Sequence, residues 1–207
     1  MTTPVVVLAG GTGTGKSTLA RALEEEGAAR IDADRIGHAM LERDDVRAEI
    51  ERRFGAEVIG EDGRVDRGRL GARVFADAAE LERLNALVHP PLVAEIVRRV
   101  DRLRREGRHG LIVIDAALWP QFEGRPPVDL WIMATAPREV RRERIERRDG
   151  ISRQQAEARL DRQQRLEPFL DEADAVLDTA RPRDETRAAL FSLLDERLGP
   201  RWRTARP

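Results

Sequence analysis

Val5-Val6-Val7-Leu8-Ala9 leads directly into Gly10-Gly11-Thr12-Gly13-Thr14-Gly15-Lys16-Ser17-Thr18. The first five residues are apolar and mostly β-branched, which predicts a buried strand. Glycines then break the run, and Gly10, Gly15, Lys16 and Ser17 fit the phosphate-loop pattern G-x-x-x-x-G-K-[ST], with a helix beginning near Lys16. Backbone N–H groups of such a loop and the positive end of the helix bind phosphate oxygens. The stretch therefore predicts a nucleotide-binding site.

The same pattern assigns roles to its side chains. The lysine reaches the terminal phosphates of ATP, and the serine hydroxyl is offered to Mg²⁺. The alternative is a glycine-rich turn with a chance lysine. Against it, Lys16 is the only lysine, and every other basic residue among the 37 is arginine. We expect ATP to bind Gly11, Thr12, Gly13, Thr14, Gly15, Lys16, Ser17 and Thr18.

Composition narrows the class of protein. The 207 residues carry a net charge of −1, so nothing indicates a nucleic-acid-binding or anionic-membrane-binding surface. The absence of cysteine excludes disulfides and thiol catalysis. The first apolar run, Pro4 to Ala9, is short and lacks a basic leader, and no apolar stretch is long enough to cross a bilayer. We expect a cytoplasmic protein that is a monomer or a weak homo-oligomer.

Strand and helix patterns alternate along the chain. Further strands are predicted at Ala28 to Ile31, Leu111 to Asp115, Leu130 to Ala134 and Asp174 to Asp178. This alternation predicts an α/β fold with a doubly wound, mostly parallel sheet in a single domain, residues 1–207. Residues 35–91 are expected to form a helical insertion, in which His89-Pro90-Pro91 interrupts a helix, and residues 138–166 an arginine-rich lid. The tail from Gly199 to Pro207 is expected to fray.

Two aspartates follow the second predicted strand. In an extended segment, Asp32 and Asp34 share one face, and one could accept a proton from an attacking hydroxyl while the other organises Mg²⁺. Alternatively they lie in a solvated turn or at a helix start, where Asp34 could cap a helix beginning at Arg35. Asp115 ends a buried strand, as the Mg²⁺-assisting aspartate of a Walker B strand does, or it turns the chain towards solvent.

The predicted lid is rich in arginine. Arg144 and Arg148 are spaced to share a helix face, from which guanidinium groups could stabilise the charge of a transferring phosphoryl group. For most of the neighbouring arginines, an ordinary solvated helix is the better interpretation. His89, Trp119 and Phe122 have packing or capping as their default interpretation.

Taken together, these residues resemble the dephospho-coenzyme A kinase family. The shared motifs extend over nearly the whole chain, from Gly10–Ser17 and Asp32-Ala33-Asp34 through Leu84-Asn85 and His89-Pro90 to Arg144–Asp149 and Ala158-Arg159 to Gln163. The resemblance implies that ATP phosphorylates the 3′-hydroxyl of dephospho-coenzyme A, giving coenzyme A and ADP. It implies Asp34 as the base, Lys16 with Arg144 or Arg148 as charge stabilisers, and an acceptor site that includes Asp32, Asp34, His89, Pro90 and the helical insertion.

Some residues depart from the family pattern. Ala116-Ala117-Leu118-Trp119-Pro120 stands where Pro-Leu-Leu-Phe-Glu is expected, and Thr179 replaces an asparagine expected near the last strand. A lysine that is usual in the segment after Gln163 is absent, with Phe169 nearby. These departures concern the acceptor and adenine regions rather than the phosphate loop. Two alternatives therefore remain: a kinase for another nucleoside or nucleotide, and a catalytically silent nucleotide-binding relative.

Overall fold

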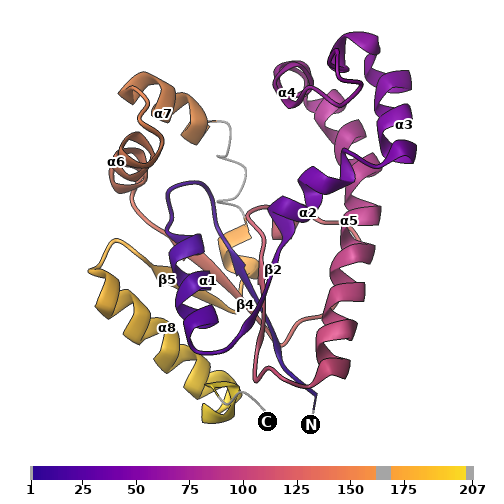
Figure 1. Cartoon of the computed structure of the whole chain (residues 1–207). Coiled ribbons are helices and arrows are strands. Elements are labelled where there is room, and N and C mark those ends of the chain that lie inside the picture. Colours follow the sequence, from indigo (N-terminus) through magenta and orange to yellow (C-terminus); the bar gives the residue numbers. More distant parts are fainter. Residues whose placement is uncertain (1, 162–168, 204–207) are drawn as a thin grey trace.

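A sheet of parallel strands forms the centre of the computed structural model, which describes residues 2–161 and 169–203 (Figure 1). Its five strands are β1 (Val5–Ala9), β2 (Ala29–Asp32), β3 (Ile112–Asp115), β4 (Leu130–Thr135) and β5 (Ala175–Asp178). They lie in the order β2-β3-β1-β4-β5, and every neighbouring pair is parallel. The predicted α/β fold is confirmed, and β1 lies in the middle of the sheet with all five of its residues buried.

Helices cover both faces of the sheet. On one face, α1 (Lys16–Glu25) and α8 (Arg183–Leu198) place Leu19, Leu23, Leu190 and Leu194 against the strands. On the other face, α2 (Ala33–Met40) and the long α5 (Ala78–Glu106) supply a second apolar cluster that includes Ile36 and Ile96. Alternate residues of β1 enter opposite clusters, as the strand period requires, with Val5, Val7 and Ala9 in one and Val6 and Leu8 in the other.

The segment between β2 and β3 is helical, as predicted. After α2 come α3 (Asp44–Phe54), a short 3₁₀ turn at Ala56–Val58, and α4 (Arg67–Ala76). These elements and the start of α5 have an apolar cluster of their own, which includes Ile50, Phe54 and Val74. We call this projection, residues 41–88, the helical arm. Its role in binding an acceptor stays a prediction.

The predicted interruption at His89-Pro90-Pro91 is wrong. Helix α5 continues through both prolines and ends at Glu106. Prolines inside a helix leave two carbonyl groups of the preceding turn without their usual donors. Burial offsets that cost, since His89, Leu92, Val93, Ile96 and Val100 are buried along the helix. The break between helices lies earlier, at Asp77. The Asp77 side chain accepts a hydrogen bond from the N–H of Ala79 and caps the start of α5.

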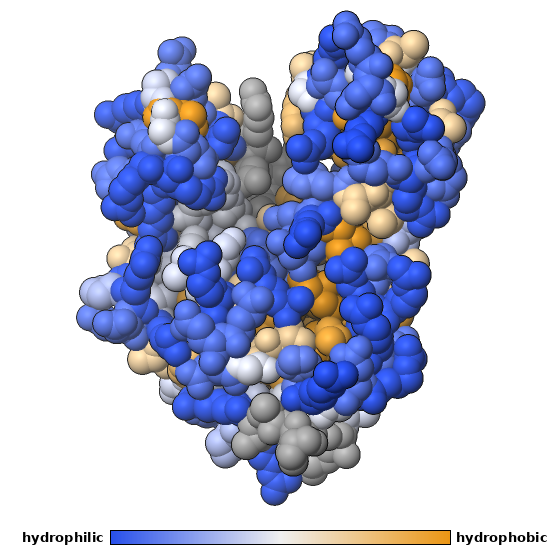
Figure 2. All heavy atoms as spheres, in the orientation of Figure 1, coloured by the Kyte–Doolittle hydropathy of each residue, from blue (hydrophilic) through white to orange (hydrophobic). Residues whose placement is uncertain are grey.

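The predicted lid consists of α6 (Arg138–Asp149) and α7 (Arg153–Asp161), and its last residues, 162–166, lie outside the described part of the chain. In Figure 2 the lid and the helical arm are two largely hydrophilic projections on either side of a hollow. The fraying predicted for the tail is wrong for Pro200–Arg203, which form a 3₁₀ helix. There Trp202 is buried and donates from its indole N–H to Asp195 at 2.8 Å, while residues 204–207 lie outside the described chain.

Candidate active site

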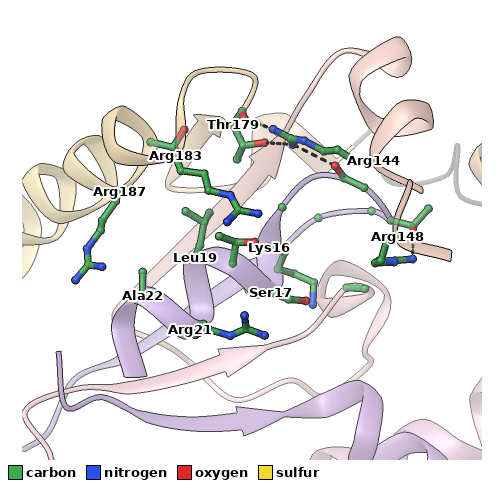
Figure 3. A pocket seen from close by; sticks show the side chains of 18 of the residues that line it. Lys16, Ser17, Leu19, Arg21, Ala22, Arg144, Arg148, Thr179, Arg183 and Arg187 are labelled. Carbon is green, nitrogen blue, oxygen red and sulfur yellow. Dashed lines mark hydrogen bonds between the residues drawn. The ribbon is translucent and has the colours of Figure 1, made fainter. Parts of the chain in front are cut away.

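A cavity of about 750 Å³ opens where β1 runs into the glycine-rich loop. The loop, the first turns of α1, the lid and the start of α8 form its walls (Figure 3). Open parallel sheets place ligand sites at the carboxyl ends of their strands, and this cavity lies at the end of the central one. Its lining includes every predicted ATP-binding residue except the buried Thr14, together with Asp34, Arg144 and Arg148.

The loop requires glycine at two positions for the same steric reason, a close approach of backbone from another element. Gly10 has φ 143°, and a Cβ there would lie 2.5 Å from the carbonyl oxygen of Ala134. Gly13 has φ 78°, and its Cβ would lie 2.6 Å from the carbonyl oxygen of Arg141 in the lid. A side chain at either position would therefore force neighbouring backbone apart. The Thr14 hydroxyl donates to the Gly11 carbonyl at 2.8 Å and stabilises the turn.

Lys16 lies in the first turn of α1 with its side chain almost fully buried. Its ammonium group pairs with a carboxylate oxygen of Asp115 and lies 3.8 Å from Oδ2 of Asp34. The other oxygen of Asp115 pairs with Arg30 at 2.5 Å. Both oxygens of Asp115 thus have a cationic partner, and its role as a Mg²⁺ ligand stays a prediction. Sequence reasoning missed Arg30, because its link to Asp115 depends on how β2 and β3 are paired.

Asp32 ends β2 and Asp34 lies within α2, so the two aspartates do not share an extended face. Asp32 is the N-cap of α2, with its Oδ1 accepting from the N–H of Arg35 at 2.8 Å, and Asp34 lies in the first helical turn. The predicted extended geometry is wrong, because the helix begins at Ala33 and not after the aspartates. The capping alternative is correct in kind, but Asp32 and not Asp34 is the cap.

Asp34 nevertheless lines the cavity beside Lys16. The Asp34 side chain is half exposed, and the partial burial of its carboxyl raises its pKa, while the positive charge of Lys16 and a backbone hydrogen bond from Ala117 oppose the rise. A carboxylate with a raised pKa is a better proton acceptor at neutral pH than an ordinary aspartate. Ala117 belongs to the segment that departs from the family pattern, so the backbone there contributes directly to the site.

The lid arginines contact the loop. Arg144 donates to the carbonyl of Gly13 at 3.2 Å, and to the hydroxyl and the carbonyl of Thr179 at 3.0 and 2.6 Å (Figure 3). Arg141 donates to the carbonyl of Thr12 at 3.0 Å. Arg148 pairs mainly with Asp149 at 2.7 Å. Sequence reasoning noted Thr179 as a departure but missed that its hydroxyl joins the lid to the loop.

Neither His89 nor Pro90 is among the described residues that line the cavity. His89 is buried, and its ring contacts Phe122 edge-on at a centroid distance of 4.9 Å. Burial lowers the pKa of His89, which favours a neutral ring. Trp119 and Phe122 are also buried in the core, which confirms the packing interpretation for these two residues. The acceptor role implied for His89 and Pro90 stays a prediction.

The oxygen atoms that line the cavity suit a hard cation such as Mg²⁺ only when phosphate oxygens complete its coordination. Among the described residues, no three carboxylate, histidine or cysteine side chains are grouped as a metal site. Mg²⁺, however, is commonly held by one or two protein oxygens and the phosphates of a nucleotide. The exposed Ser17 hydroxyl lines the cavity at the phosphate loop and fits that limited demand.

Comparison with known families identifies the chain. Residues 4–184 match the family model described as Dephospho-CoA kinase. The chain belongs to the dephospho-CoA kinase family. A curated dephospho-CoA kinase of Anaeromyxobacter dehalogenans is 38% identical over 200 residues, which cover 96% of this chain and 94% of that protein.

Two solved structures are similar in fold to this member of the dephospho-CoA kinase family. Protein TT1252 of Thermus thermophilus has a TM-score of 0.76 and 29% identity, covering 95% of this chain and 98% of its own. The dephospho-CoA kinase of Campylobacter jejuni has a TM-score of 0.57 and 25% identity, covering 93% and 96%. Within the described residues, the helices are too short or too polar for any of them to cross a membrane.

Proposed function

We propose that this protein is a dephospho-CoA kinase that transfers the γ-phosphoryl group of ATP to the ribose 3′-hydroxyl of dephospho-coenzyme A. The observation that carries the proposal is the meeting of Lys16 and Asp34 in one cavity at the end of β1. A phosphate-binding cation and a proton-accepting carboxylate are the two groups that phosphoryl transfer to an alcohol needs close together.

The phosphate chain of ATP would bind in the glycine-rich loop. Its backbone N–H groups and the start of α1 face the phosphate oxygens, and Lys16 reaches the terminal phosphates. The lid and α8 add Arg148, Arg183 and Arg187 to the cavity wall, where guanidinium groups suit phosphate oxygens (Figure 3). Arg144 holds the loop carbonyl of Gly13 and so keeps the loop closed against the lid.

In the reaction, Asp34 accepts the proton of the acceptor hydroxyl. The oxygen of that hydroxyl forms a bond to the γ-phosphorus as the bond from the γ-phosphorus to the β–γ bridging oxygen breaks, and ADP leaves. Lys16, with Arg144 or Arg148, stabilises the charge that develops on the transferred group. Mg²⁺, held by Ser17 and the phosphate oxygens, would supply further charge neutralisation on the phosphates.

The acceptor is expected in the hollow between the lid and the helical arm, beside Asp34. The capping bond of Asp32 to the Arg35 N–H fixes the start of α2 and therefore the position of Asp34. Cytoplasmic location and a monomeric or weakly associated state remain predictions from the sequence.

The test is an acceptor-dependence assay. Purified protein with MgATP is expected to release ADP only when dephospho-coenzyme A is added, and mass spectrometry is expected to detect coenzyme A as the product. ADP release stimulated by other nucleosides would assign the protein to a different kinase reaction. ATP binding without turnover on any acceptor would indicate a silent relative.

A further inference from the structure

Arg30 lies outside the expected machinery, yet it is joined to it through Asp115. Strand pairing explains how. Asp32 on β2 lies directly opposite Asp115 on β3, and both residues are on the face of the sheet where Val113 joins the apolar cluster under α1. Like charges in directly opposed positions repel one another. Arg30 lies two residues before Asp32 and therefore on the same face.

The Arg30 guanidinium reaches both carboxylates from that position. One terminal nitrogen lies 2.5 Å from Asp115 and 3.9 Å from Asp32, and the other lies 3.2 Å from Glu24 on α1. Its Nε is buried without a hydrogen-bond partner among the described residues. A buried donor without a partner is unfavourable, so the pairing with Asp115 has to hold the side chain there.

Asp115 connects Arg30 to Lys16. Asp115 is almost fully buried, and its two oxygens pair with one cation each. Phosphate oxygens in the glycine-rich loop compete with Asp115 for the Lys16 ammonium. With Arg30 present, the three groups carry a net charge of +1, and Asp115 keeps a cation when Lys16 turns to phosphate. Without Arg30, the net charge is zero and Lys16 has to leave a buried carboxylate unpaired.

We propose that Arg30 is a positioning residue for nucleotide binding: by pairing with Asp115, it frees Lys16 to bind the phosphates of ATP. The inference rests on the proposed role of Lys16 in binding ATP. It differs from a simple structural role, in which Arg30 would only tie α1 to β2 through Glu24. The two roles make different demands, because only the first depends on Asp115.

Four variants separate these roles, with ATP affinity measured by calorimetry and folding checked by thermal denaturation. Arg30→Met keeps the aliphatic stem and removes the charge, and is expected to weaken ATP binding about tenfold, since a partly buried charge beside a phosphate site is lost. Arg30→Lys is expected to lie closer to the original protein than Arg30→Met. Glu24→Gln, the matched control, is expected to bind ATP normally.

The decisive variant is Arg30→Met combined with Asp115→Asn, which is expected to recover most of the lost affinity because no carboxylate then holds Lys16. The proposal is overturned if folded Arg30→Met binds ATP normally, if Glu24→Gln weakens ATP binding as much as Arg30→Met, or if adding Asp115→Asn recovers nothing. Coenzyme A formation by the original protein is measured in parallel. If that reaction is absent while the affinity pattern holds, the proposed function fails and the inference about Arg30 stands.

Discussion

The ammonium of Lys16 lies 3.8 Å from the carboxylate of Asp34, although one residue begins the helix after β1 and the other lies in the helix after β2. The contact places a carboxylate at the mouth of the phosphate loop. It also gives Asp34 two opposed influences, burial that raises its pKa and a cation that lowers it. Phosphate bound by Lys16 would therefore lie within reach of a group able to accept a proton.

Asp34→Asn tests whether this carboxylate is the base. The amide keeps the size of the side chain but cannot accept the proton, so kcat is expected to fall roughly 100-fold or more. ATP affinity, measured by calorimetry, is expected to change little, because the backbone nest and Lys16 are intact. An Asp34→Asn protein with nearly full kcat would remove Asp34 from the role of base.

The pH dependence of kcat gives a second test of Asp34. Burial raises its pKa above the ordinary aspartate value, and the base has to be ionised to work. Activity is therefore expected to fall as pH drops through that raised pKa, earlier than an ordinary aspartate would allow. In Asp34→Asn, the residual activity is expected to lose this acid limb. An unchanged limb in the variant would assign it to another group.

Lys16→Ala removes the cation between Asp34 and Asp115. ATP affinity is expected to fall at least about tenfold, since a charged contact to phosphate is lost in a partly buried site. Calorimetry checks the affinity, and Arg102→Ala on the exposed part of α5 is a matched control with a surface ion pair. Equal ATP affinity in Lys16→Ala and the control would contradict the assignment of Lys16.

Local patterns predicted the strands and the phosphate loop because the signals for both lie in short runs of consecutive residues. The β-branched run before Gly10 and the glycine spacing are enough to place β1, the loop and α1. The continuity of α5 through Pro90-Pro91 could not be predicted in this way. There, burial of residues such as Leu92 and Ile96 against the sheet overrides a local signal that favours a break.

The site was predicted where single residues match a motif, and missed where a contact depends on register or topology. Arg30 meets Asp115 only because β2 and β3 pair as they do. Arg144 reaches Gly13, 131 residues earlier, only because the lid folds back over the loop. Asp32 is the N-cap because α2 begins at Ala33, and sequence patterns place such helix boundaries poorly.

Thr179→Val tests the connection between lid and loop. The Thr179 hydroxyl accepts from Arg144 at 3.0 Å and donates to the carbonyl of Thr14 at 2.6 Å. Valine keeps the shape and removes every hydrogen bond of the hydroxyl, including one to the Thr135 carbonyl. The kcat/KM for ATP is therefore expected to fall about tenfold, the scale of a hydrogen bond to a charged group. Thr179→Ser keeps the hydroxyl and is expected to retain most activity. Equal kinetics for the two variants would show that the hydroxyl does not matter.

His89 gives the protein an acid-sensitive element in its core. Glu123 and a backbone hydrogen bond with Gln121 raise the pKa of His89, but burial lowers it by more. The folded state therefore favours the neutral ring. The unfolded chain binds a proton near the ordinary histidine pKa of about 6.5. Below that pH the unfolded state therefore binds more protons, and the free energy of unfolding falls as pH drops.

His89→Gln cannot take up this proton, so its stability, measured by urea unfolding at pH 7 and pH 5, is expected to fall less than that of the original protein. His38→Gln, at an exposed position of α2, is the matched control for the loss of an imidazole. An unchanged slope in His89→Gln would mean that other groups govern acid unfolding.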